Sequence, residues 1–176
     1  LIRSQLAPDL DDECGDNFIY RDLIECGEAW QRIKVSNNPV QADSYTALYE
    51  LAKNILDPVI DYYGMIKLTY GFASPALTKH IKSRIAPKLD QHAAHEKNKK
   101  GEYVCERLGA AVDFVIEDED MLAVVEWIKD NLVFDRLYYY GNNRPIHISY
   151  GGENKGEIIE MYALASGRLM PRKLKL

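Results

Sequence analysis

The sequence predicts an α+β fold with a small, antiparallel-rich sheet and helices packed against it. Helical periodicity dominates the early part of the chain, and most short β-prone runs come after residue 64. Two of these runs are separated by "GNNR", a turn sequence typical of a hairpin. Helices followed by strands mixed with helices favour α+β over a regular βα alternation.

The composition is that of an ordinary globular domain. The chain has 176 residues, of which 47% are hydrophobic and 28% are charged. A domain of this size buries about 70% of its unfolded surface. Because the net charge is −5, nonspecific binding of nucleic acid or of an anionic membrane is disfavoured. We therefore expect neither partner, and the sequence leaves the oligomeric state open.

Cysteine usage and hydropathy bear on the cellular location. The three cysteines, an odd number at wide spacing, do not form a disulfide framework. No apolar run reaches the roughly 18–20 residues that a membrane helix needs, and no secretory signal is recognisable. These features favour a cytoplasmic location, although the chain opens with Leu1 and a preceding segment could have been removed.

Turn and capping signals divide the first part of the chain. Residues 1–16 predict an irregular, acidic lead-in, and Asn17 is expected to cap a helix over Phe18–Trp30. A longer amphipathic helix follows the turn at "NNP". Pro58 should kink or restart this helix, because proline lacks a backbone donor, and Gly64 should end it.

The remaining segments predict strands, two short helices and one long loop. Strands are expected over 65–70, 110–116, 134–140 and 145–150. Ser74 should cap a short helix, and an acidic stretch should open a second helix at Met121. Residues 82–108 are polar and predict a long loop, which in a compact domain is usually functional or disordered.

Asp113 is unusual because it lies within the apolar strand "AAVDFVI". An unpaired carboxylate buried there would cost several kcal/mol. It needs a cation, a cluster of hydrogen bonds or a metal, unless it faces a solvated edge. His147 lies in "PIHISY", where strand alternation places it on the face opposite Ile146 and Ile148.

Two further histidines, His92 and His95, lie in "DQHAAHE" and would share a face if the segment were helical. Taken separately, each histidine is more simply a hydrogen-bonded or surface residue. Taken together, a loop histidine, Asp113 and His147 form a set of three nitrogen and oxygen ligands. Such a set leaves a fourth position for water, as catalytic zinc requires.

With these residues in order, the chain resembles the D-alanyl-D-alanine carboxypeptidase-like zinc peptidases of the hedgehog/DD-peptidase fold. The matching segments are "NFIYRDLI", the long helix ending in "DYYG", "LTYGFASPAL", "DQH", "LGAAVDF" and "FDRLYYYGNNRPIHISY". The resemblance implies a zinc peptidase-like domain over 17–150 and a C-terminal extension over 151–176. It also implies that His92, Asp113 and His147 bind Zn²⁺.

The resemblance breaks down around the ligands. A charged insertion separates His92 from Asp113, so His95 could be the ligand instead. The family's substrate-binding arginine corresponds to Ala73, and its general base corresponds to Arg144. Replacements could come from the insertion, with Glu96 as the first choice of base and Glu102 or Glu106 as alternatives. Arg107 or Arg144 could replace the missing arginine, and Cys105 could be a further ligand.

The leading hypothesis is therefore a zinc-dependent hydrolase of the peptidase type, which cleaves a peptide or other amide bond through metal-activated water. Its substrate could be anionic, because Arg144 near the metal would favour a carboxylate or phosphate. The alternative hypothesis is a catalytically divergent zinc-binding domain that serves as a binding or regulatory module. A metal-dependent hydrolase of a non-peptide amide also remains open.

Overall fold

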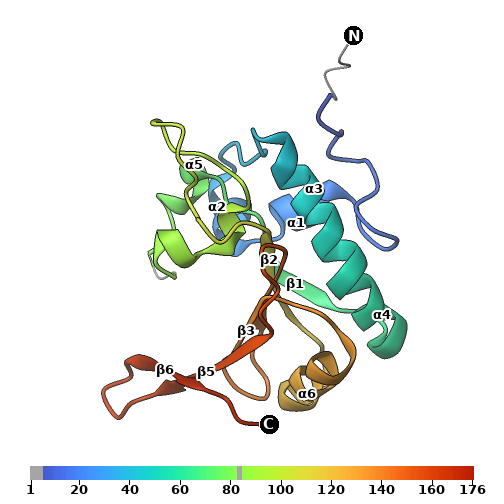
Figure 1. Cartoon of the computed structure of the whole chain (residues 1–176), viewed down its shortest axis with the longest axis vertical. Coiled ribbons are helices and arrows are strands. Elements are labelled where there is room, and N and C mark those ends of the chain that lie inside the picture. The colour runs from blue at the N-terminus through green and yellow to red at the C-terminus, as the bar shows by residue number, and fades with distance from the viewer. Residues whose placement is uncertain (1–5, 83–84) are drawn as a thin grey trace.

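A six-stranded sheet with helices packed against it forms the fold, in a computed structural model that describes residues 6–82 and 85–176 (Figure 1). The α-helices are α1 (Tyr20–Glu25), α2 (Glu28–Ile33), α3 (Ala42–Leu51), α4 (Asp57–Tyr63), α5 (Pro75–Thr78) and α6 (Met121–Asn131). The strands are β1 (Lys67–Tyr70), β2 (Ala110–Val115), β3 (Arg136–Tyr139), β4 (Ile146–Tyr150), β5 (Glu157–Ala163) and β6 (Leu169–Lys173). These helices and this sheet confirm the α+β prediction.

The sheet is mostly antiparallel. Its strand order is β1-β2-β4-β3-β5-β6, and every neighbouring pair is antiparallel except β3 and β5. The predicted hairpin forms between β3 and β4. In the central pair, Asp113 of β2 lies directly opposite His147 of β4. This register makes the two sequence-predicted ligands cross-strand neighbours.

One continuous helix, comprising α3, the π-helical segment η1 (Ala52–Leu56) and α4, crosses one face of the sheet. Pro58 does not restart it, because the helix runs without a break from Ala42 to Tyr63. Proline cannot donate to the carbonyl one turn earlier, and the preceding turn is wider, since the Asp57 amide donates to Ala52. The expected end at Gly64 is confirmed, where the amide donates to the Ile60 carbonyl.

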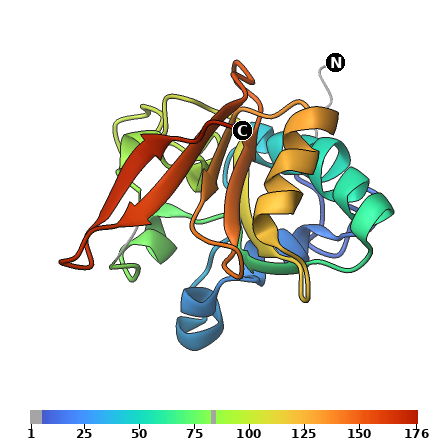
Figure 2. The ribbon, with the colours of Figure 1, turned by 90° about the horizontal axis from the view of Figure 1, so that it is seen from below.

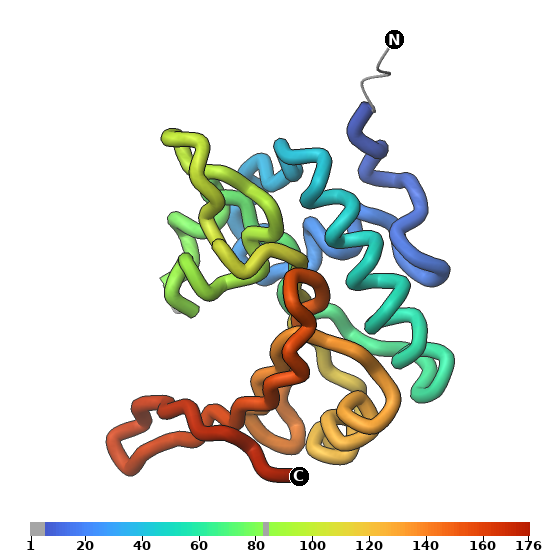
Figure 3. Tube along the Cα trace, in the orientation of Figure 1, coloured from blue at the N-terminus to red at the C-terminus, as the bar shows by residue number. Residues whose placement is uncertain are grey.

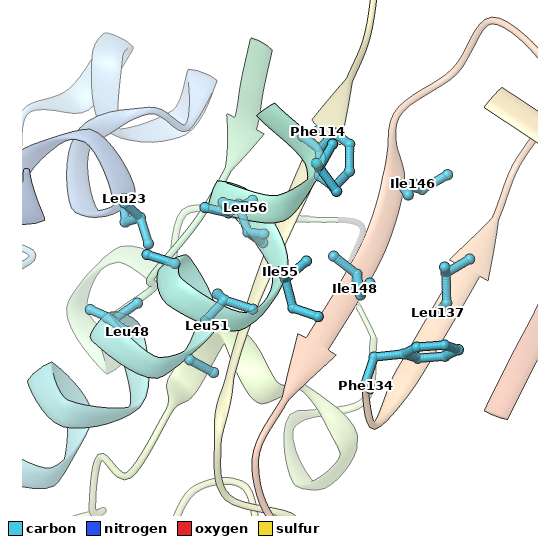
Figure 4. Packing of buried hydrophobic residues seen from close by; sticks show 14 of the residues in the cluster. Leu23, Leu48, Leu51, Ile55, Leu56, Phe114, Phe134, Leu137, Ile146 and Ile148 are labelled. Carbon is cyan, nitrogen blue, oxygen red and sulfur yellow. The ribbon is translucent and has the colours of Figure 1, made fainter. Parts of the chain in front are cut away.

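The hydrophobic core lies between this helix, α6 and one face of the sheet. Figure 4 shows Ile55 of the helix next to Ile148 of β4, and Leu51, Phe114 and Ile146 belong to the same buried cluster. Because side chains alternate along a strand, the intervening residues of β2 and β4 point to the opposite face. Residues 75–82 and 85–108 lie on that side, away from α6 and the long helix (Figure 2).

The structure differs from the expected helix over Phe18–Trp30. Two short helices, α1 and α2, form there, with Gly27 between them as the N-cap of α2. Asn17 caps neither helix, and its side-chain amide instead donates to Asp57 at 2.9 Å. Asn17 thus ties the chain before α1 to the long helix, a contact that local sequence does not reveal.

Two flanking segments, the described part of 1–16 and residues 151–176, form hydrogen bonds with the rest of the chain. Within the described part of 1–16, Cys14 is fully buried and its amide donates to Phe18. At the other end, residues 151–176 extend the sheet with β5 and β6, and β5 pairs in parallel with β3. The β5–β6 hairpin projects from the body of the molecule (Figure 3).

Among the described residues, no helix is both long enough and apolar enough to cross a membrane.

Candidate metal centre

Three side chains that are distant in the sequence meet on the sheet face opposite the core. His92 lies in the 3-10 segment η3 (Gln91–Ala93), Asp113 in β2 and His147 in β4. Asp113 Oδ1 is 3.1 Å from His92 Nε2 and 2.9 Å from His147 Nδ1. The two ring nitrogens are themselves 3.1 Å apart. The donor atoms of this group therefore converge closely enough to hold one metal ion.

The site is buried but retains an opening. His92 and His147 are each 2% exposed, whereas the Asp113 side chain is 26% exposed. The three residues line a cavity of about 100 Å³ together with Tyr70, Ile85, Asp90 and Tyr140. A cavity of this size can hold a few water molecules. It therefore leaves room for a further ligand beside the three side chains.

The orientation of His92 suits a metal ligand. Its Nδ1 lies 2.7 Å from the carbonyl oxygen of Gly71. A carbonyl only accepts hydrogen bonds, so Nδ1 carries the proton. In the neutral ring, Nε2 then presents its lone pair toward Asp113 and His147. A hydrogen bond of this kind on the outer nitrogen is the usual support of a metal-binding histidine.

The turn after β1 contacts His92 through its backbone and is held in place by several hydrogen bonds. The Ala73 amide donates to the His92 carbonyl at 2.9 Å, and the Ser74 amide donates to Asn37 Oδ1 at 2.7 Å. Asn37 is buried, and its side-chain amide also donates to the carbonyls of Ile24 and Phe72. Asn37 thus joins α1 to the turn beside the site. Asn37 belongs to the "NNP" turn motif, which does not reveal these distant partners.

Electrostatics within the group favour opposite charges. Burial by itself would raise the pKa of Asp113, but the adjacent His92 charge and the hydrogen bonds from both histidines hold it well below its usual range. Burial opposes protonation of His92, yet the Asp113 charge raises the His92 pKa above its usual value. A metal cation bound beside the Asp113 carboxylate would take the place of the proton on His92.

The structure brings His92, and not His95, to the other two ligands. His95 Nε2 instead accepts a hydrogen bond from the Gly109 amide at 3.1 Å. Its ring meets that of Tyr103 edge-on. The structure therefore favours His92 over His95 as the histidine that joins Asp113 and His147.

The Glu96 carboxylate is fully engaged away from the cavity. It accepts hydrogen bonds from the amides of Val40 and Gln41 and from the hydroxyl of Ser44. These donors surround the start of α3, where a carboxylate satisfies free amides and complements the helix dipole. Glu96 is buried in this position. The surroundings of Glu96 are those of a capping residue.

Arg144 is exposed in the β3–β4 turn and is not part of the cavity lining, and the buried Ala73 offers no polar side chain. In the insertion, Cys105 donates to the Lys88 carbonyl. Arg107 donates to the Leu89 carbonyl. The insertion, residues 93–108, was expected to supply replacements for the missing groups, but none of its residues lines the cavity; among the described residues, the loop positions that do are Ile85, Asp90 and His92.

Asp90, Tyr70 and Tyr140 are cavity residues that sequence reasoning did not select. Asp90 is 2% exposed and accepts the His92 amide at 3.1 Å. The Tyr70 ring lies against that of His92, with centroids 3.9 Å apart. Burial, and to a smaller extent the negative charge of Asp113, raises the pKa of Tyr140 to about 12, so its hydroxyl stays protonated. The "DQH" segment placed Asp90 two residues before His92, and this spacing is the signal that could have pointed to it.

No protein-family model, curated protein or solved structure matches this chain.

Proposed function

We propose that the chain binds one zinc ion at His92, Asp113 and His147 and hydrolyses a peptide or other amide bond there. The observation that carries the proposal is the convergence of three donor atoms from η3, β2 and β4 beside a small open cavity. Two imidazoles and one carboxylate, with a free position, are the ligand set of catalytic rather than structural zinc. The resemblance to the D-alanyl-D-alanine carboxypeptidase-like peptidases supports the same reading.

Zinc in such a site polarises a carbonyl and lowers the pKa of water to near 7. The residues of the chain would supply the rest. Tyr140, protonated and in the cavity, would donate a hydrogen bond to the substrate carbonyl oxygen. Asp90 is the second carboxylate in the cavity, and its place there suits a proton acceptor better than the capping position of Glu96.

Zinc content tests the site. Protein stripped of metal and then dialysed against zinc should hold about one zinc per chain, as a three-ligand site implies. Asp113→Ala and His147→Ala should lose it, whereas His95→Ala should keep it. Unchanged zinc content in both ligand variants would show that the assignment is wrong.

Release of amino groups from a mixed peptide digest tests the activity. The zinc-loaded protein should release them, and Asp90→Asn should slow the release by about 10²–10⁴-fold while zinc stays bound. The second candidate, a zinc-binding module without catalysis, is favoured by Ala73 and by the engagement of Glu96. Stoichiometric zinc with no release of amino groups would establish that second function.

A further inference from the structure

A second cavity adjoins the metal cavity across Tyr70. It has a volume of about 690 Å³ and is lined by residues of α2, β1 and the segment after α5: Glu28, Ala29, Arg32, Thr69, Tyr70, His80, Ile81 and Lys82. Tyr70 belongs to both cavities, and on the metal side its ring packs against His92. A molecule bound in the larger cavity would therefore lie next to the metal ligands.

The metal cavity is too small to hold a whole substrate. About 100 Å³ accommodates a scissile bond and little more of a substrate. The rest of any peptide or amide must lie outside it, and the larger cavity begins at the shared residue Tyr70.

The larger cavity is cationic in a chain that is acidic overall. Arg32 and Lys82 contribute two permanent positive charges against the single carboxylate of Glu28. Both cations are exposed, and within the described part of the chain neither takes part in an ion pair. Arg32 and Lys82 are thus left available to a ligand.

We propose that this cavity is the substrate subsite for a carboxylate, so that the chain acts on acidic peptides or amides. This inference rests on the proposed function, which supplies a peptide or amide substrate, and a carboxylate is the anion that such molecules carry. Arg32 binds a carboxylate through its planar fork and Lys82 through its point charge. The carboxylate comes from an acidic side chain or from a free C-terminus.

Binding of three small peptides to the zinc-loaded protein, followed by NMR titration, tests the subsite. Acetyl-Ala-Glu-amide carries a side-chain carboxylate, acetyl-Ala-Gln a terminal one, and acetyl-Ala-Gln-amide none. At least one acidic peptide should bind about tenfold more tightly than the neutral one, and the tighter of the two identifies the source of the carboxylate. Equal binding of all three peptides would overturn the proposal.

Charge-matched variants separate the cavity from the net charge of the protein. Arg32→Gln with Lys82→Gln should abolish the preference, by about threefold to fivefold for each exposed charge. Lys34→Gln with Lys79→Gln removes the same charge at residues that do not line the cavity, and this control should retain the preference. If both double variants lose the preference equally, the cavity is not the subsite.

Zinc binding is measured separately from peptide binding. Both double variants should bind zinc as the unmodified protein does, because neither changes a ligand. If zinc fails to bind any form but the charge preference follows Arg32 and Lys82, the proposed function fails and the carboxylate site stands. If zinc binds normally and no preference exists, only the subsite is wrong.

Discussion

His92 Nδ1 lies 2.7 Å from the carbonyl oxygen of Gly71, a position where no larger residue fits. A Cβ added to Gly71 would come 2.0 Å from the carbonyl oxygen of Leu23, which is backbone and cannot move aside. The same Leu23 carbonyl accepts the Phe72 amide. The absence of a side chain at Gly71 thus lets the turn pack on α1 and present its carbonyl to His92.

Gly71→Ala should therefore damage the metal centre without touching a ligand. The clash should lower the free energy of unfolding by about 1–3 kcal/mol, as overpacking does. Displacement of the carbonyl should weaken zinc binding by about 10–100-fold, as is typical for partners of metal-binding histidines. Chemical denaturation and competition with a zinc chelator measure the two effects.

Gly101→Asn is the control for this prediction. Gly101 has a φ of 81° and open space around it, and asparagine tolerates that backbone conformation. Gly101→Asn should leave zinc affinity unchanged. If Gly71→Ala also binds zinc normally, the Gly71 carbonyl does not support the site.

Glu96→Gln should reduce stability while sparing zinc. The Glu96 carboxylate accepts three hydrogen bonds at the start of α3, and glutamine cannot accept all of them with one oxygen. We expect a loss of about 1–3 kcal/mol in the free energy of unfolding. Glu102→Gln, at an exposed position, should cost much less. A loss of hydrolysis with unchanged stability would instead assign Glu96 to catalysis.

The sequence predicted the strand residues of the site because local alternation determines them. Ile146 and Ile148 fix one face of β4, so His147 must lie on the other, and the same reasoning applies to Asp113 in β2. Their grouping with a loop histidine rested on side-chain chemistry, and the resemblance implied the same set. Strand order depends on which distant segments meet, and no local pattern records that choice. The parallel pairing of β3 with β5 escaped prediction for the same reason.

Side chains with long-range partners were hardest to predict. Glu96 lies in a charged loop and looks available for catalysis, yet its donors lie more than fifty positions earlier in the chain. Asn37 reads as a turn residue, and its acceptors come from α1 and the turn after β1. Asp90 lies in a segment that was expected to be a loop, and only the folded chain places it in the cavity beside Asp113 and His147. In each case the tertiary partner, not the local sequence, decides the role.

The metal-free protein should become less stable as the pH rises above neutrality. Asp113 raises the folded-state pKa of His92 above its unfolded value, so protonated His92 favours the folded state. This stabilisation is complete below the unfolded pKa of about 6.5 and is lost as the pH rises through the folded value. The midpoint of thermal unfolding, measured from pH 5.5 to 9 with a chelator present, should fall over that range.

Zinc should reverse this trend. Zinc needs the proton on His92 Nε2 removed, so its stabilising effect should grow as the pH rises. Asp113→Asn removes the carboxylate that raises the His92 pKa and should flatten the pH dependence of the metal-free protein. An unchanged slope in Asp113→Asn would place its origin elsewhere.

The last prediction is that the zinc-loaded protein cleaves ordinary D-Ala-D-Ala peptides poorly. The resembled peptidases bind the substrate carbonyl with an arginine and use a carboxylate as base, and these positions are Ala73 and Arg144 here. Arg144 cannot accept a proton, and Ala73 is buried without a polar group. Loss of a general base alone lowers the rate by about 10²–10⁴-fold.

Hydrolysis of a D-Ala-D-Ala-terminated peptide should be compared in the unmodified protein, Arg144→Glu and Arg144→Gln, all with bound zinc. We expect weak cleavage by the unmodified protein. Appearance of cleavage in Arg144→Glu but not in Arg144→Gln would show that the chain kept the ligands and lost this base. Robust cleavage by the unmodified protein would refute the prediction, and loss of that cleavage in Asp90→Asn would identify Asp90 as the base.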